Sequence, residues 1–179
     1  MRVIGIDPPT GWAILEMRAG TQRPLFVDCD VAPDWDQIPW WRDDIVLVAV
    51  EGAVFFFPSD ARKGTAGNTL AAKAQALWEA AKMGQRVYGA ALRSGVAAVE
   101  ITSPKWRRHL GVRVGGRQNA AAAALGLRRA TVDVEVAAAL KLRVEGWPAR
   151  SNDTVRDAAG VAIGGYAKWM AERGQRRSG

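Results

Sequence analysis

The stretch RVIGIDPPTGWAIL, residues 2–15, decides the fold of this chain. Residues 2–7 form an apolar run typical of a buried strand, and the DPPTG segment that follows has the composition of a tight turn. A second apolar run covers residues 11–17, and a third covers residues 24–31. Three apolar runs joined by short connections predict an antiparallel meander.

The next part of the chain predicts parallel strands. Residues 45–52, IVLVAVEG, are apolar without alternation, which is typical of a strand covered on both faces. Residues 68–93 have the apolar periodicity of a helix, and residues 96–102 predict a fifth strand. We therefore expect an α/β fold: a five-stranded mixed sheet, with three antiparallel strands and then a parallel β-α-β unit, flanked by helices.

The rest of the chain is predicted to be mainly helical. We expect helices over residues 103–110, 117–126, 131–146 and 154–172, and a frayed basic tail from about residue 173. A chain of 179 residues without internal repeats suits one domain spanning residues 1–179. It has neither a signal-peptide pattern nor an apolar run near the ~18 residues of a membrane helix, so we expect a cytoplasmic protein with no membrane partner.

The composition restricts the chemistry and suggests an acidic partner. The chain has one cysteine, Cys29, and one histidine, His109, so it lacks a His/Cys cluster for zinc, and any bound metal would use oxygen ligands. The net charge is +7, and residues 61–129 hold 13 of the 25 Lys and Arg residues but only 2 of the 18 Asp and Glu residues. This asymmetry favours a polyanion such as nucleic acid, although an arginine-rich solvated surface would look the same.

Two carboxylates follow buried strands of the predicted sheet. Asp7 ends the first apolar run, and Glu51 ends the fourth. A carboxylate near a core is costly unless it is paired or bound to a metal. If the two strands are parallel neighbours, both side chains emerge at the carboxyl edge of the sheet, where open α/β sheets bind ligands. Pairing with an arginine or a backbone amide remains the alternative for each.

Two more carboxylates begin the last predicted helix. Asp153 and Asp157 are four residues apart, so they share a helical face, and small residues that allow close packing follow Asp157. Asp153 could equally be a helix cap or a first-turn acid. Three or four converging carboxylates without His or Cys describe a magnesium site. Two such ions can activate a water and stabilise the leaving oxygen in phosphodiester hydrolysis.

The segments IGIDPPTGWAIL, VAVEGAVFF and DTVRDAAGVAIGGYA resemble, in order, the three acidic motifs of RuvC-type Holliday junction resolvases, members of the ribonuclease H-like superfamily. The resemblance implies that Asp7, Glu51 and Asp157 are catalytic metal ligands, with Asp153 the fourth, for two Mg²⁺ or Mn²⁺ ions and no small-molecule cofactor. Two prolines in DPPTG and the spacing of four before Asp157 depart from the family pattern. The looser match is closer to phage-type members, so the protein could be phage-encoded.

The resemblance also implies how DNA is bound. An aromatic residue after the glutamate stacks at the junction centre in the family, and Phe55 and Phe56 stand in that region, unless they belong to the core. Lys105 and Arg117 match basic positions near the scissile phosphate. Composition alone adds four further candidate phosphate contacts: Arg62, Lys63, Arg107 and Arg108. Family members are homodimers, and residues 68–93 are the expected interface.

The sequence therefore predicts a magnesium-dependent crossover junction endodeoxyribonuclease that resolves four-way DNA junctions in recombination and repair. Two alternatives remain open. The same carboxylates could serve another ribonuclease H-like nuclease that acts on forks, flaps or RNA–DNA hybrids. A protein that kept the fold but lost metal binding would only bind nucleic acid.

Overall fold

The computed structural model describes residues 1–20, 22–31, 44–52, 67–112, 131–149 and 151–177. The elements in chain order are β1 (Arg2–Asp7), β2 (Gly11–Glu16), β3 (Leu25–Val31), β4 (Ile45–Gly52), α1 (Gly67–Arg93), β5 (Ala97–Thr102), α2 (Ser103–His109), α4 (Val132–Arg143) and α5 (Asp153–Arg177).

The strands form one mixed sheet in the order β3-β2-β1-β4-β5. The pairs β1–β2 and β2–β3 are antiparallel, whereas β1–β4 and β4–β5 are parallel, which confirms the predicted topology. The β1–β4 register pairs Ile6 with Val50. The next residue on each strand is a carboxylate, so Asp7 and Glu51 end neighbouring strands at the same edge.

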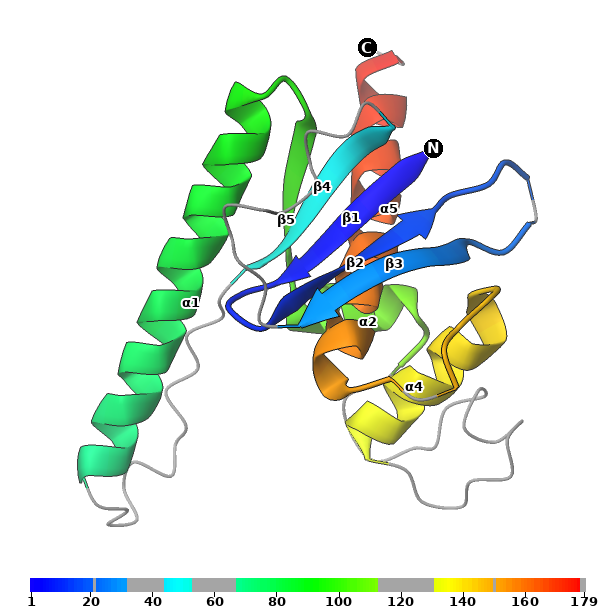
Figure 1. Cartoon of the computed structure of the whole chain (residues 1–179). Coiled ribbons are helices and arrows are strands. Elements are labelled where there is room, and N and C mark those ends of the chain that lie inside the picture. The colour runs from blue at the N-terminus through cyan, green and yellow to red at the C-terminus, as the bar shows by residue number, and fades with distance from the viewer. Residues whose placement is uncertain (21, 32–43, 53–66, 113–130, 150, 178–179) are drawn as a thin grey trace.

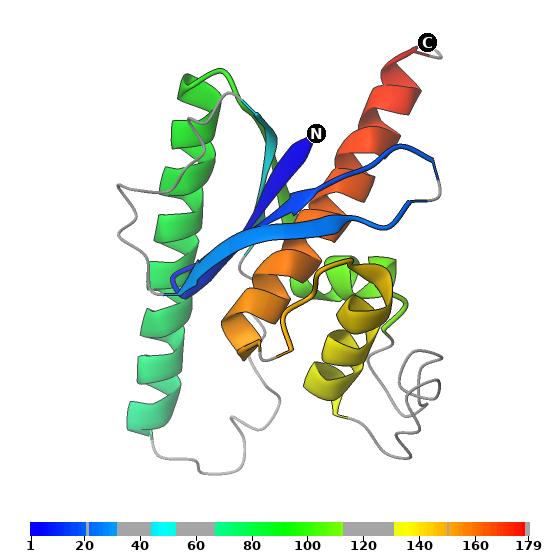
Figure 2. The ribbon, with the colours of Figure 1, turned by 45° about the vertical axis from the view of Figure 1, so that its right-hand side comes forward.

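The sheet lies between α1 on one face and α5 on the other, and Figure 2 shows this layering most clearly. Alternate strand residues supply the two cores. Val3, Leu15 and Leu47 belong to the cluster under α5, and Ile4 and Val48 belong to the cluster under α1. Helices α2 and α4 pack beside α5, so three helices lie on this side of the sheet, and of these α5 is the one in extensive contact with β1.

Small residues allow α5 to lie unusually close to the sheet. A Cβ atom at Gly5 of β1 would lie 2.0 Å from the Ala158 carbonyl oxygen and 2.5 Å from the Ala162 amide nitrogen. Further along the helix, a Cβ at Gly165 would lie 2.3 Å from the Cβ of Ala49 on β4. The small-residue run after Asp157 is therefore a close-packing surface, because backbone of the helix rests directly on backbone of the sheet.

The ends of two helices differ from the prediction. Helix α5 extends to Arg177, so the tail expected to fray from about residue 173 is helical to that point. A 3.7 Å ion pair between Lys168 and Glu172 and the stacking of Arg173 on Trp169 support its last turns. Helix α4 ends at Arg143 rather than residue 146, because Val144 adopts an extended conformation.

Two further predictions concern the rest of the chain. The helix predicted over residues 117–126 lies outside the described residues. In the part of the chain that the structure describes, no helix has the length and apolar character needed to cross a membrane.

The contact between α5 and β4 makes Gly165 sensitive to substitution. We expect Gly165→Ala to lower the free energy of unfolding by about 2 kcal/mol, because the new methyl group overlaps Ala49. In the matched change Gly174→Ala, on the same helix, the new Cβ meets no described atom within 4 Å. It should leave stability unchanged or raise it by up to about 1 kcal/mol. Urea denaturation of both variants checks this, and equal stabilities would show that the close contact is not a constraint.

Candidate active site

Asp7 ends β1 and is held by the turn that follows it. The Thr10 hydroxyl donates a 2.7 Å hydrogen bond to Asp7 Oδ2, and the Thr10 amide donates to the Asp7 carbonyl at 2.8 Å. The Pro8–Pro9 peptide bond within this turn is cis. Burial raises the pKa of Asp7, and the Thr10 hydrogen bond and the positive charge of Arg107 offset part of that rise. The turn therefore fixes a half-buried carboxylate at the edge of the sheet.

Glu51 lies on β4 beside Asp7, and its pKa is raised to about 7. Burial is the largest cause, followed by the negative charges of Asp7 and Asp157. The polar side-chain groups of Ser103 and Trp106 on α2 lower the pKa of Glu51 and so offset part of this rise. The Trp106 indole nitrogen is buried and has no hydrogen-bond partner among the described residues, so its effect on Glu51 comes from proximity.

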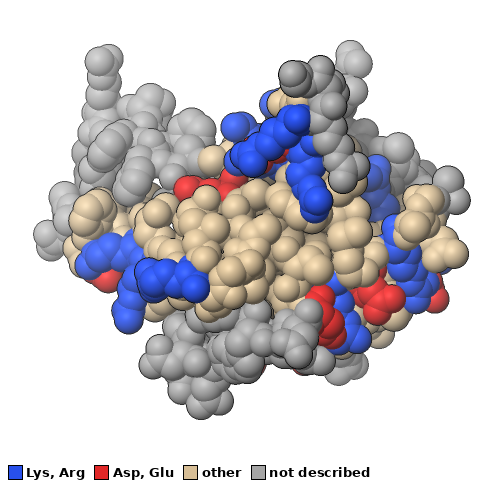
Figure 3. Space-filling view, turned by 90° about the horizontal axis from the view of Figure 1, so that it is seen from above, with Lys and Arg blue, Asp and Glu red and all other residues tan. Residues whose placement is uncertain are grey.

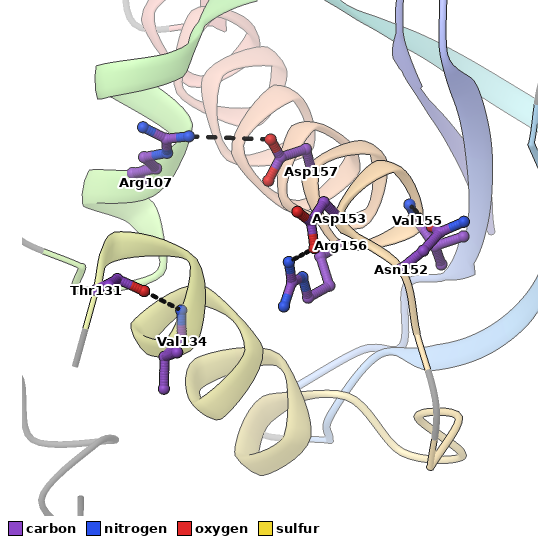
Figure 4. Close-up of polar contacts among 8 residues, drawn as sticks. All are labelled: Arg107, Thr131, Val134, Asn152, Asp153, Val155, Arg156 and Asp157. Atoms are coloured by element: carbon purple, nitrogen blue, oxygen red, sulfur yellow. Dashed lines mark hydrogen bonds and ion pairs between the residues drawn. The ribbon is translucent and has the colours of Figure 1, made fainter.

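Asp157 lies in the first turns of α5, above the carboxyl end of β1. Burial and the charge of Asp7 raise its pKa to about 6, and Arg107 is the main opposing influence. The Arg107 guanidinium Nη2 lies 3.9 Å from Asp157 Oδ2, and Figure 4 shows Arg107 reaching from α2 towards this carboxylate. The ion pair is longer than a hydrogen bond, so Asp157 is only partly neutralised.

Three carboxylates from separate elements thus gather at one edge of the sheet. Each of Asp7 and Asp157 raises the pKa of Glu51, and Asp7 raises that of Asp157. Among the described residues, no three His, Cys, Asp or Glu side chains stand close enough together to hold a metal ion as they are. The carboxylates therefore lie within electrostatic range of one another rather than at coordination distance.

Asp153 does not join this group. Its side chain is 82% exposed and forms an ion pair with Arg156, on the same turn of α5. It is not the helix cap either, because Asn152 Oδ1 accepts a 2.9 Å hydrogen bond from the Val155 amide. Asp153 is a first-turn acid, one of the two alternatives that the sequence left open.

The predicted DNA contacts fall into two groups. Lys105 and Arg108 are exposed on α2, and Arg107 faces the carboxylates from the same helix. The other five candidates lie outside the described residues: Phe55, Phe56, Arg62, Lys63 and Arg117. Of the described candidates, only Arg107 forms an ion pair with one of the three carboxylates.

Sequence reasoning missed four residues that surround the carboxylates: Thr10, Ser103, Trp106 and Arg156. A signal existed for α2, because Ser103, Trp106 and Arg107 follow the i, i+3, i+4 spacing that puts side chains on one helical face. That face directs two hydrogen-bond donors and a guanidinium towards the acids.

No protein-family model and no curated protein matches this chain. Two solved structures of RuvC from Thermus thermophilus have a similar fold. One has 17% sequence identity and a TM-score of 0.57, and the other, in complex with a Holliday junction substrate, has 18% identity and a TM-score of 0.52. Each match covers 94% of this chain and 96% of the other. The expected likeness to phage-type members stays a prediction. This chain therefore has the fold of RuvC, an RNase H-like fold.

Proposed function

We propose that this protein is a metal-dependent endonuclease that resolves four-way DNA junctions. The observation that carries the proposal is the gathering of Asp7, Glu51 and Asp157 at the carboxyl edge of a sheet with the RuvC fold. The similar RuvC structure with a Holliday junction substrate supports branched DNA as the partner.

The chemistry of the three acids fits a hard divalent cation. Their mutual repulsion and burial disfavour three negative charges, as the raised pKa values of Glu51 and Asp157 reflect. An oxygen-only ligand set suits Mg²⁺ or Mn²⁺, and we propose Asp7, Glu51 and Asp157 as the ligands. When bound, such ions supply a nucleophilic water and stabilise the leaving oxygen. We leave Asp153 out of the ligand set, because its side chain is exposed and paired with Arg156.

The residues of the chain itself perform three tasks in this proposal. Thr10 holds the Asp7 carboxylate in one orientation through its 2.7 Å hydrogen bond. Ser103 and Trp106 stabilise the ionised form of Glu51, which is the form that binds cations. Arg107 offers its guanidinium to the non-bridging oxygens of the scissile phosphate, because it lies beside Asp157 and its planar fork of donors matches phosphate oxygens.

We also propose that the protein acts as a homodimer, since two symmetric cuts resolve a junction. Helix α1 is the proposed interface. It carries Trp78, which is 54% exposed, and Leu92, which is 50% exposed, and these residues lie on nearly the same helical stripe. Exposed large apolar side chains in one stripe are typical of a contact surface.

Cleavage of a labelled synthetic four-way junction, next to a linear duplex and a fork, tests the activity. We expect paired symmetric nicks in the junction alone with Mg²⁺, and none with a chelator. Asp157→Asn should lower the rate more than about 100-fold, because it removes a proposed ligand. The matched variant Asp153→Asn, on the same helix, should stay within about fivefold of wild type, because an exposed ion pair contributes little.

The other outcomes of this assay assign different functions. Faster cleavage of the fork would move the activity to a general structure-specific nuclease with the same acids. Tight binding without cleavage in any divalent ion would contradict catalysis and leave a DNA-binding protein. Equal losses of cleavage rate in Asp153→Asn and Asp157→Asn would indicate that Asp153 is also a metal ligand.

The raised pKa of Glu51 predicts a pH-dependent stability in the absence of metal. Between pH 4.5 and about 7 the folded protein holds a proton that the unfolded chain releases, so the free energy of unfolding falls as pH rises. Glu51→Gln should therefore stabilise the metal-free protein at pH 8 by about 1–3 kcal/mol and have little effect at pH 5. Urea denaturation in a chelator at both pH values measures this.

We expect Glu51→Gln to lose nuclease activity while it gains stability without metal, so the substitution changes stability and activity in opposite directions. Glu79→Gln on the exposed surface of α1 is the control, with an expected change below about 1 kcal/mol at either pH. A Glu51→Gln variant no more stable than wild type at pH 8 would contradict the repulsion among the three acids.

The proposed interface predicts a change in oligomeric state. The double variant Trp78→Ser, Leu92→Ser should convert a dimer into a monomer, because it removes two apolar contacts from α1. Light scattering during size-exclusion chromatography measures the mass directly. Leu142→Ser on α4, where the leucine is 39% exposed, is the matched control and should remain dimeric. A dimer that persists in the double variant would place the interface elsewhere.

A further inference from the structure

Two arginines, Arg107 and Arg156, flank Asp157. Each has a buried N–H donor that makes no hydrogen bond with any described residue. The Nε atoms of Arg107 and Arg156 are both buried and have no hydrogen-bond partner among the described residues. The Arg107 side chain is 22% exposed, and that of Arg156 is 13% exposed. Figure 4 shows Arg107 extending from α2 and Arg156 extending from α5 on the side that faces α4. Both groups therefore belong to the region where α2, α4 and α5 meet.

Burial of unpaired donors has an energetic cost. A buried N–H group without an acceptor costs about 1–3 kcal/mol, and an apolar side chain of similar length would avoid that cost. The cost is not explained by the ion pairs, because Arg107 reaches Asp157 only at 3.9 Å and the partner of Arg156 is the exposed Asp153. A separate phosphate at each guanidinium would give each of these donors an acceptor.

The chemistry of the two groups points to phosphate. A guanidinium presents several donors in a planar fork that matches the oxygens of a phosphate, and it stays charged when it is partly buried. Arg107 is already proposed for the scissile phosphate. Arg156 adjoins Asp157 in the chain, and its positive charge lowers the pKa of that carboxylate. Arg156 and Arg107 therefore both act electrostatically on Asp157.

Arginines also lie at the end of the molecule that carries the chain termini, and the described ones there are arranged differently. Figure 3 shows that Lys and Arg side chains on this face lie in separate groups, with other side chains between them. Arg173 on this part of α5 stacks against the Trp169 ring, 4.4 Å from its centre, rather than facing an acid of the site. Of these two arginines of α5, Arg156 alone is next to a proposed ligand.

We infer that Arg156 is a phosphate-binding residue of the active site, which holds a backbone phosphate next to the scissile one, and that Asp153 occupies its guanidinium until DNA arrives. The inference rests on the proposed nuclease function, because it requires DNA at the three carboxylates. In this arrangement the ion pair between Asp153 and Arg156 breaks when the phosphate binds, and the Asp153 carboxylate is then hydrated by solvent.

Binding measured without cleavage tests this inference. A labelled four-way junction is titrated with protein in Ca²⁺, by fluorescence anisotropy, at several salt concentrations. For Arg156→Met we expect an affinity about tenfold weaker than that of wild type. We also expect the slope of a plot of log Kd against log[salt] to fall by about one, because one phosphate contact is lost. Arg156→Lys should keep the slope of wild type and bind more weakly, because it retains the charge without the planar fork.

Two controls separate a phosphate contact from a structural role. Arg173→Met removes the same charge from the other end of α5 and should leave both affinity and slope unchanged. Thermal unfolding of Arg156→Met shows whether the variant is folded, and Arg156→Lys provides the second reading if it is not. An Arg156→Met variant with the slope of wild type, or an Arg156→Lys variant with the reduced slope, would overturn the inference.

The result also distinguishes this inference from the proposed function. If wild-type protein neither binds nor cuts the junction, the proposed function fails, and the role of Arg156 fails with it. If wild-type protein binds and cuts the junction while Arg156→Met keeps its affinity and slope, the function stands and only the role of Arg156 is rejected.

Discussion

The contact between α5 and the sheet is the constraint on which the rest of this structure depends. Backbone rests on backbone where Gly5 of β1 meets Ala158 and Ala162 of the helix. This contact sets the distance of the whole helix from the strands, and Asp157 is the residue directly before Ala158. A side chain larger than hydrogen at Gly5 would lift the helix and carry Asp157 away from Asp7. The packing of small residues therefore positions a charged group.

The gathered carboxylates act against the stability of the protein that holds them. Burial and like charge raise the pKa of both Glu51 and Asp157, so ionising these carboxyls costs more in the folded protein than in the unfolded chain. Stability comes instead from the two apolar clusters on either side of the sheet. A cation that binds among the acids would relieve the repulsion, which explains physically why such a cluster is tolerated. Under this proposal the repulsion is the source of metal affinity.

Helix α2 connects the core to the acids more closely than its short length suggests. Trp106 is fully buried, and a Cβ at Gly160 of α5 would lie 2.5 Å from its ring, so the indole anchors α2 against α5. The same ring lies beneath the Arg107 guanidinium, whose Cζ atom is 5.0 Å from the ring centre. One anchored aromatic side chain thus orients a cation towards Asp157 and a polar N–H towards Glu51. The spacing along α2 was visible in the sequence, but its partners were not.

Local patterns in the sequence determined the strands and the acids at the strand ends, whereas the pairing of β1 with β4 came only from the structure. Alternation and turn composition act over a few residues, so β1, β4 and the turn after Asp7 could be predicted from the chain alone. The sequence could not decide between the roles open to Asp153, because a spacing of four places two acids on one face without saying where that face points. Tertiary packing shows where each acid lies: Asn152 caps the helix and Asp153 is exposed beside Arg156, whereas Asp157 is largely buried near Asp7. Electrostatic partners distant in the chain, such as Arg107 and Asp157, depend on how helices pack, and no local pattern encodes that arrangement.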